Sequence, residues 1–284
     1  MTTRLSTRLG AREVTIAYDG HTVSTDLDVE VPVGGFTAVV GPNACGKSTL
    51  LRCLARLHRP SHGAVLLDGE DIYRLDTRTV ARKVGLLPQS TLVPDRMSVH
   101  DLVARGRFPH QGMFRQWSQA DRDAVDRAMT LTGVQDLALR PVDQLSGGQR
   151  QRVWLALVLA QDTETVLLDE PTTFLDLAHQ VEILRLCRAL NEEQGRTVVA
   201  VLHDLNHAAR CASHMIVMRD GQVHATGSPG DIVTEQMVRD VFGLDAVVVA
   251  DPVAGMPMVV PRDLGEADPA RTPSAARGED SRAA

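Results

Sequence analysis

The chain has 284 residues, of which 43 % are hydrophobic, enough to fill the core of one large α/β domain or two small ones. Its formal net charge is −6, without the basic clusters of nucleic-acid-binding domains, so no nucleic-acid partner is expected. The four cysteines never form C-x-x-C, which argues against a zinc finger or a disulfide framework. No stretch approaches the roughly 18 apolar residues of a membrane span, so any membrane role is expected through partners.

Short apolar runs bounded by turn residues predict six strands, three of which (FTAVV, TVLLD and TVVAVL) are almost entirely apolar. Such runs are typical of central parallel strands covered by helices on both faces. The predicted strands are Glu13 to Tyr18, Phe36 to Val40, Ala64 to Leu67, Val84 to Leu87, Thr165 to Leu168 and Thr197 to Leu202. Helical patterns follow the three apolar runs at Ser48 to Leu57, Leu177 to Gln194 and Asp204 to Ala212. This alternation predicts a doubly wound parallel sheet.

Between Gln89 and Gln161 the pattern changes to successive helices. The candidates are Ser98 to Arg107, Gln119 to Thr132 and Gly148 to Ala160. We therefore expect a helical subdomain at residues 89–161, inserted into a core formed by residues 10–88 and 162–245. After Pro261 almost no apolar residues remain, so a single domain, 1–261, is expected to end in a disordered tail, 262–284.

The strand FTAVV leads directly into GPNACGKST and then into a helix, which is the context of a phosphate-binding loop. Gly41 and Gly46 allow the backbone N–H groups to point at a β-phosphate. Lys47 reaches the β- and γ-phosphate oxygens, and Ser48 binds Mg²⁺. A plain glycine turn is the alternative, which this spacing makes rare. The predicted nucleotide-binding residues of the loop are Gly41, Pro42, Asn43, Ala44, Cys45, Gly46, Lys47, Ser48 and Thr49.

Two residues of this loop leave questions open. A positive φ at Ala44 would cost roughly 1–2 kcal/mol, so a right-handed or mildly strained backbone is expected there. Cys45 lies at a helix N-terminus, which lowers the pKa of a thiol, so either a reactive thiol or a merely packed one fits this position.

The run TVLLDE ends in two acids. Asp169 can hold Mg²⁺ through its water shell, and Glu170, one residue further, can orient or deprotonate the water that attacks a γ-phosphate. Alone, such a pair is more often a helix N-terminal charge or a turn. The phosphate-binding loop upstream favours Glu170 as the catalytic base.

LSGGQRQRVWLALVLA, residues 145–160, stands just before VLLDEPTTFLD, residues 166–176, and this order resembles ATP-binding cassette (ABC) ATPases. The resemblance extends over about residues 10–245. It implies an α/β fold with a P-loop NTPase (RecA-like) core, whose parallel sheet is flanked by helices, an N-terminal antiparallel β element and a helical subdomain insertion. It also implies ATP and Mg²⁺ as cofactors and ATP hydrolysis to ADP and phosphate, coupled to transport.

In this family the LSGGQ segment faces nucleotide held by the other subunit, so ATP would join two chains. Locally, Ser146 and Gln149 form an S-x-x-Q capping box. A helix N-terminus with two glycines also exposes N–H groups and the positive end of the dipole to a phosphate. The residues expected to contact ATP in trans are Leu145, Ser146, Gly147, Gly148 and Gln149.

The resemblance implies roles for four further residues, each of which alone is usually structural. Tyr18 would stack on adenine. Gln89 would sense Mg²⁺ and couple to the transporter. Asp176 would touch the opposite subunit, and His203 would contact the γ-phosphate and position the attacking water.

A metal cluster of His203, His207, Cys211 and His214 is the competing interpretation of this region. It is disfavoured because His203 follows a strand and so does not share a helix face with His207. His214 begins the next apolar run, MIVM, which predicts a strand.

GRFPHQGMFRQWSQADRDAVDRAM, residues 106–129, and PTTFLDLAHQ, residues 171–180, resemble ATPases of bacterial iron(III)-siderophore importers. This implies a peripheral subunit at the cytoplasmic side of the inner membrane, forming a homodimer or pairing with a similar ATPase. It would work with polytopic permease subunits and, indirectly, an extracytoplasmic substrate-binding protein. Cobalamin or haem importers remain alternatives, as does a soluble ABC ATPase that acts on ribosomes or DNA. A switch with negligible turnover is disfavoured because Glu170 is present.

Overall fold

The computed structural model describes residues 7–18, 20–89, 96–112, 117–173 and 175–262. At its centre is a six-stranded sheet in the order β10-β9-β3-β8-β7-β6. Pairings among β3, β6, β7, β8 and β9 are parallel, and β10 adds an antiparallel edge. The predicted α/β fold with a parallel sheet is confirmed. The strands are β3 (Phe36–Val40), β6 (Val84–Leu87), β7 (Thr165–Asp169), β8 (Thr197–Val201), β9 (His214–Arg219) and β10 (Gln222–Gly227).

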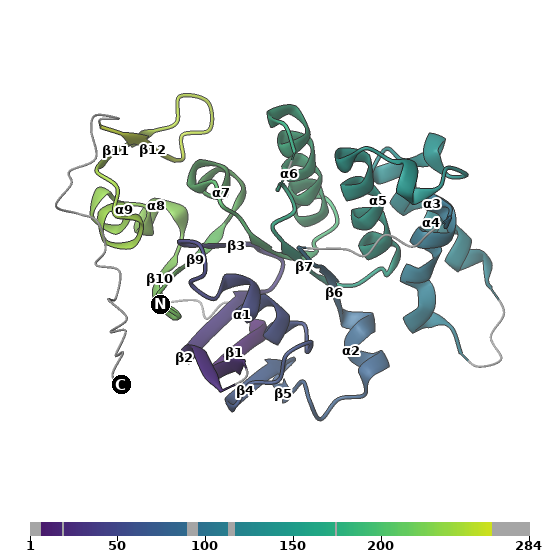
Figure 1. The fold of residues 1–284 in the computed structure, drawn as a ribbon, viewed down its shortest axis with the longest axis horizontal. Helices are drawn as coiled ribbons and strands as arrows, with labels where there is room; N and C mark the ends of the chain where they lie inside the picture. Colours follow the sequence, from purple (N-terminus) through teal and green to yellow (C-terminus); the bar gives the residue numbers. More distant parts are fainter. Residues whose placement is uncertain (1–6, 19, 90–95, 113–116, 174, 263–284) are drawn as a thin grey trace, which may run out of the picture.

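Both faces of this sheet are covered. Successive residues of a strand face opposite sides, so Ala38 and Val40 pack in one core and Val39 in a second. The first core includes α5 (Gly147–Ala160), α6 (Leu177–Glu192) and α7 (Leu205–Cys211), and the second includes α1 (Lys47–Leu54). Figure 1 shows α6 and α7 above the sheet and α1 below it.

A smaller antiparallel sheet lies beside α1, in the order β2-β1-β4-β5 (Figure 1). Its strands are β1 (Thr7–Tyr18), β2 (His21–Pro32), β4 (His62–Leu67) and β5 (Glu70–Asp71). This is the N-terminal antiparallel β element that the family resemblance implied.

Between β6 and β7 the described chain is mainly helical. Helix α2 (Thr77–Lys83) precedes β6, and after β6 come α3 (Val99–Ala104), η1 (Arg105–His110), α4 (Gln119–Leu131), η2 (Gln135–Leu137), η3 (Val142–Gln144) and α5. The predicted helix from Ser98 to Arg107 therefore changes to a 3₁₀ helix at Arg105. The buried side chain of Arg107 ties these helices together, because it bonds to Asp121 Oδ1 (2.9 Å) and to Ala160 O (2.8 Å).

The described chain ends in α8 (Pro229–Ile232), α9 (Glu235–Phe242) and a hairpin of β11 (Ala246–Ala250) and β12 (Pro257–Pro261). None of these elements was predicted. The predicted tail lies outside the described residues from 263 onward. In the described parts of the chain, no helix has the length and apolar character needed to span a membrane.

Candidate active site

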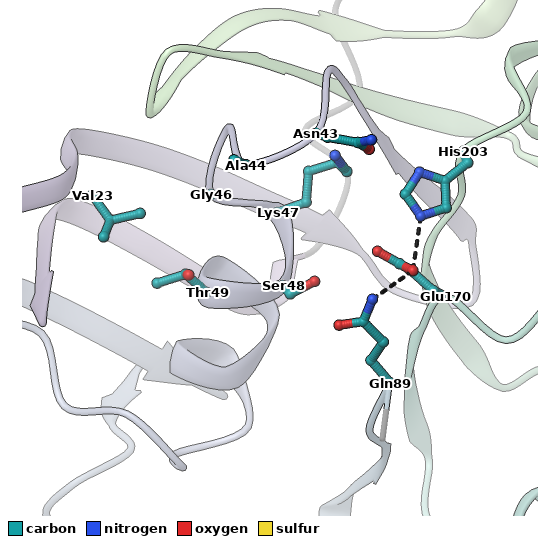
Figure 2. A pocket seen from close by; sticks show the side chains of 10 residues that line it. All are labelled: Val23, Asn43, Ala44, Gly46, Lys47, Ser48, Thr49, Gln89, Glu170 and His203. Carbon is teal, nitrogen blue, oxygen red and sulfur yellow. Dashed lines mark hydrogen bonds and ion pairs between the residues drawn. The ribbon is translucent and has the colours of Figure 1, made fainter. Parts of the chain in front are cut away.

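Four loops meet at the carboxyl edge of the parallel strands, where α/β sheets usually bind ligands. Residues 41–49 follow β3, Gln89 follows β6, Glu170 follows β7 and His203 follows β8. They surround a cavity of about 400 Å³ (Figure 2). The lining residues are Val23, Asn43, Ala44, Gly46, Lys47, Ser48, Thr49, Gln89, Glu170 and His203.

The glycines of the loop after β3 are required by its path. The backbone at Gly46 has a φ of 99°, in the left-handed region that favours glycine. A Cβ on Gly41 would lie 2.1 Å from the carbonyl oxygen of Met218. The buried Lys47 ammonium donates to the carbonyl oxygens of Gly41 (3.0 Å) and Pro42 (2.6 Å). The backbone of the loop therefore curls around the ammonium group of Lys47 at the wall of the cavity.

Ala44 has a φ of 60°, so the expectation of a right-handed backbone is wrong and the strained alternative holds. Replacing Ala44 with glycine should raise the free energy of unfolding by about 1 kcal/mol, because glycine adopts this conformation without steric cost. Chemical denaturation measures the change. The control is Ala55→Gly at the other end of α1, where φ is −80° and glycine gives no such gain. A destabilised Ala44→Gly variant would contradict the strain.

Cys45 is 5 % exposed, and its Sγ lies 3.8 Å from Lys47 Nζ. Burial raises the pKa of the Cys45 thiol, and the nearby ammonium offsets only part of this effect. The structure therefore favours a packed, protonated thiol over a reactive thiolate.

Asp169 ends β7 and is 1 % exposed. Its Oδ1 accepts a 2.7 Å hydrogen bond from Ser48 Oγ, and its buried Oδ2 has no partner among the residues that the structure describes. Burial raises the pKa of Asp169, an effect that a bound cation would oppose. Hydroxyl and carboxylate oxygens are the ligands that Mg²⁺ prefers. The residues present therefore fit this ion.

One oxygen of Glu170 is surrounded by donors from three loops. Glu170 Oε2 accepts from Gln89 Nε2 (2.7 Å) and Thr173 Oγ1 (3.1 Å), and His203 Nε2 lies 2.8 Å away. Burial raises the pKa of Glu170, but the bonds from His203, Gln89 and Thr173 outweigh it and hold the pKa below its usual range. The group is thus an ionised acceptor at neutral pH. Figure 2 shows its second oxygen turned into the cavity.

Several predicted site residues lie outside this cavity. The Tyr18 ring stacks on His58 with the ring centroids 4.0 Å apart, and its contact with adenine stays a prediction. Asp176 caps the N-terminus of α6, where its Oδ1 accepts from the backbone N–H of His179 (2.9 Å). The segment from Leu145 to Gln149 leads into α5, and the capping box of Ser146 and Gln149 is confirmed.

Among the residues that line this cavity or bond to Glu170, two were not predicted from the sequence. Val23 lines the cavity from β2, and Thr173 donates to Glu170. Thr173 stands three residues after Glu170 in the same motif, so its hydroxyl was a recognisable candidate. Val23 had no signal, because it reaches the cavity only through the position of β2 beside residues 41–49 in the folded chain.

The histidines of the rejected metal cluster lie on separate elements. His207 is on α7, and His214 begins β9 as predicted. His203 lies between β8 and α7 and faces Glu170. Among the described residues, no group of three or more His, Cys, Asp or Glu side chains is arranged to hold a metal ion.

Solved structures with the same fold include an inward-facing putative metal-chelate type ABC transporter, with a TM-score of 0.77 and 28 % identity, covering 90 % of this chain and 98 % of that chain. A dimeric bacterial ABC transporter cassette matches with a TM-score of 0.70 and 28 % identity, over 78 % of this chain and 98 % of that chain.

Sequence relatives agree with these structures. The ferric enterobactin transport ATP-binding protein of Escherichia coli is 52 % identical over 92 % of this chain and 96 % of that protein. The achromobactin transport ATP-binding protein of Dickeya dadantii is 50 % identical over 90 % of this chain and 95 % of that protein. The family model described as "ABC transporter" matches residues 24–173, more than half of the chain, and includes Lys47, Asp169 and Glu170. With this fold and these relatives, the chain belongs to the family of ABC transporter ATPases.

Proposed function

We propose that this chain hydrolyses ATP to drive an importer of iron(III)-siderophore complexes. The observation that carries the catalytic part is the Glu170 carboxylate, which faces the phosphate-binding loop across one cavity. The cargo is supported by the relatives named above and by the iron(3+)-hydroxamate import ATP-binding protein of Bacillus subtilis, which is 45 % identical over 90 % of this chain and 94 % of that protein.

ATP would enter with its phosphates against the loop after β3. Lys47 would exchange its bonds to the Gly41 and Pro42 carbonyls for phosphate oxygens. Ser48, Asp169 and Gln89 would hold Mg²⁺, which would neutralise phosphate charge.

Glu170 would orient and deprotonate the attacking water with the oxygen that faces the cavity. Its other oxygen stays bound to Gln89 and His203, which would hold the carboxylate in place. His203 would also contact the γ-phosphate, because it lines the same cavity as Lys47 and Glu170.

Each site would be completed by a second subunit. Residues 145–149 lie outside the cavity at the N-terminus of α5, where glycine N–H groups and the helix dipole suit a phosphate of the opposite subunit. Asp176 would meet the same partner, and Tyr18 would stack on adenine. Closure of the two subunits over two ATP molecules would then act on polytopic permease subunits. The ATPase would be peripheral at the cytoplasmic side of the membrane, with a substrate-binding protein outside.

Cobalamin is the second candidate cargo. The cobalamin import ATP-binding protein of Halobacterium salinarum is 40 % identical over 85 % of this chain and 60 % of that protein. The siderophore relatives are more similar and match over nearly their whole length, so they are favoured.

The test is purification from membranes through a tag on this chain, with mass spectrometry of the partners and an ATPase assay of the complex. We expect a polytopic permease, together with uptake of radiolabelled iron–siderophore that is lost in Lys47→Ala cells. If Lys47→Ala cells lose uptake of cobalamin and keep that of iron–siderophore, the cargo is cobalamin. Recovery with ribosomes or DNA would overturn the transport function.

A further inference from the structure

We propose that the C-terminal hairpin β11–β12 is a positioning element for His203 and acts through α7. The inference rests on the role proposed above for His203 in ATP hydrolysis. The hairpin lies outside residues 24–173, the part that the family model matches. His203 and α7 lie outside that part as well.

Helix α7 is the link between His203 and the hairpin. It begins two residues after His203, and Asp204 between them caps the helix by accepting from the backbone N–H of His207 (2.7 Å). A helix of seven residues is marginal by itself, so its position depends on its neighbours. Those neighbours include α6, β3 on the side of the sheet and β12 on the side of the hairpin (Figure 1).

Asn206 joins α7 to β12 with two hydrogen bonds. Its Oδ1 accepts from the backbone N–H of Val259 (2.7 Å), and its Nδ2 donates to the carbonyl oxygen of the same residue (3.2 Å). In an antiparallel ladder, alternate residues direct both backbone groups away from the partner strand. The Asn206 amide thus takes the place of a neighbouring strand, which fixes both the distance and the orientation of α7.

Arg210, one turn further along the same face of α7, makes the second tie. Its Nε donates to Asp251 Oδ2, while Asp251 Oδ1 accepts from the N–H groups of Val253 (2.8 Å) and Ala254 (3.1 Å) in the hairpin loop. Asp251 is 3 % exposed, and these donors, Arg210 first, lower its pKa to about 2. The pair is therefore charged at neutral pH and holds the end of the hairpin to α7.

The C-terminal segment also reaches the site directly. Phe242, the last residue of α9, lines a hollow of about 600 Å³ with Gly41, Pro42, Asn43 and His203. Helix α9 packs on β11, so one structural unit lines this hollow beside the phosphate-binding loop through Phe242 and supports His203 through α7. A displacement of this unit would change the 2.8 Å separation between His203 Nε2 and Glu170 Oε2.

The test compares kcat, KM and ATP affinity after Asn206→Leu, which removes both bonds at similar volume. We expect kcat to fall about tenfold with KM and ATP affinity nearly unchanged, because a small misplacement of a catalytic group acts on the chemical step. Asp251→Asn, which keeps the shape but weakens the second tie, should lower kcat less.

Asn191→Leu is the matched control. Asn191, on α6, likewise makes two hydrogen bonds to the backbone, donating to the carbonyls of Gly34 (2.9 Å) and Arg196 (2.8 Å), but neither bond involves α7 or the hairpin. It should lower the melting temperature as much as Asn206→Leu does and leave kcat at the wild-type value. An equal loss of kcat in both variants would reduce the hairpin to a general contribution to stability and overturn the proposal.

A double-mutant cycle with His203→Ala isolates the route. If Asn206 acts through His203, Asn206→Leu has no further effect on kcat in the His203→Ala background. The same tenfold loss in both backgrounds would overturn the inference. If Asn206→Leu keeps the wild-type kcat while His203→Ala hydrolyses ATP slowly, the inference about the hairpin is overturned and the proposed role of His203 stands. Wild-type kcat in His203→Ala would overturn the proposed role of His203 as well.

Discussion

Replacing Glu170 with glutamine should slow ATP hydrolysis at least about 100-fold, the usual loss when a general base is removed. Glutamine has nearly the same shape and can still accept bonds from Gln89 and His203, so the cavity should persist. ATP binding should remain, because Lys47 and the backbone of the loop are untouched. An ATP-bound dimer should therefore accumulate. Single-turnover hydrolysis and size-exclusion chromatography with ATP measure the two effects.

Glu164→Gln is the control for this prediction. Glu164 immediately precedes β7, whereas Glu170 immediately follows it. The exposed side chain of Glu164 pairs with Arg8. Its neutralisation removes the same charge at the other end of the strand, and hydrolysis should stay at the wild-type rate. Hydrolysis by Glu170→Gln at a rate close to wild type would remove Glu170 from the role of base.

Replacing Lys47 with alanine should weaken ATP binding by about 10- to 100-fold. A hydrogen bond to a charged group is worth about 1.5–3 kcal/mol, which corresponds to this range of affinity. The variant also leaves the carbonyls of Gly41 and Pro42 without their donor, so the loop should lose some order. Titration with a fluorescent ATP analogue measures the affinity.

Lys83, the other lysine in the chain, provides the comparison. Its ammonium pairs with Asp68 (2.5 Å), outside the cavity. Lys83→Ala removes the same positive charge and should bind ATP as the wild type does. Unchanged affinity in Lys47→Ala would refute the assignment of residues 41–49 as the phosphate-binding loop.

The central strands were predictable because they are buried on both faces. The observed bounds of β3 and β6 are those of the predicted strands, and α6 begins at the predicted Leu177. Strand β2 is absent from the predicted strands, although Leu27, Val29 and Val31 are buried and alternate with exposed acids. Helix α1 ends at Leu54, three residues before the predicted end, and Arg56 has a positive φ that no helix accommodates.

The chemistry-bearing residues were predictable where one short motif contains them. Ser48 and Asp169 belong to two such motifs, and their contact follows because the carboxyl ends of β3 and β7 meet at one edge of the sheet. Val23 and Phe242 have no motif, and they reach the site only through the packing of the N-terminal sheet and of α9. The left-handed backbone of Ala44 is likewise a property of the folded loop, because sequence preference alone disfavours it.

The two carbonyls that accept from Lys47 bear on what a measured ATP affinity would mean. The ammonium donates to the oxygens of Gly41 and Pro42, so it is already satisfied within the chain. Phosphate oxygens that bind Lys47 would have to replace these bonds. The affinity for ATP is therefore expected to be the difference between two sets of bonds and to understate the strength of the phosphate contacts themselves.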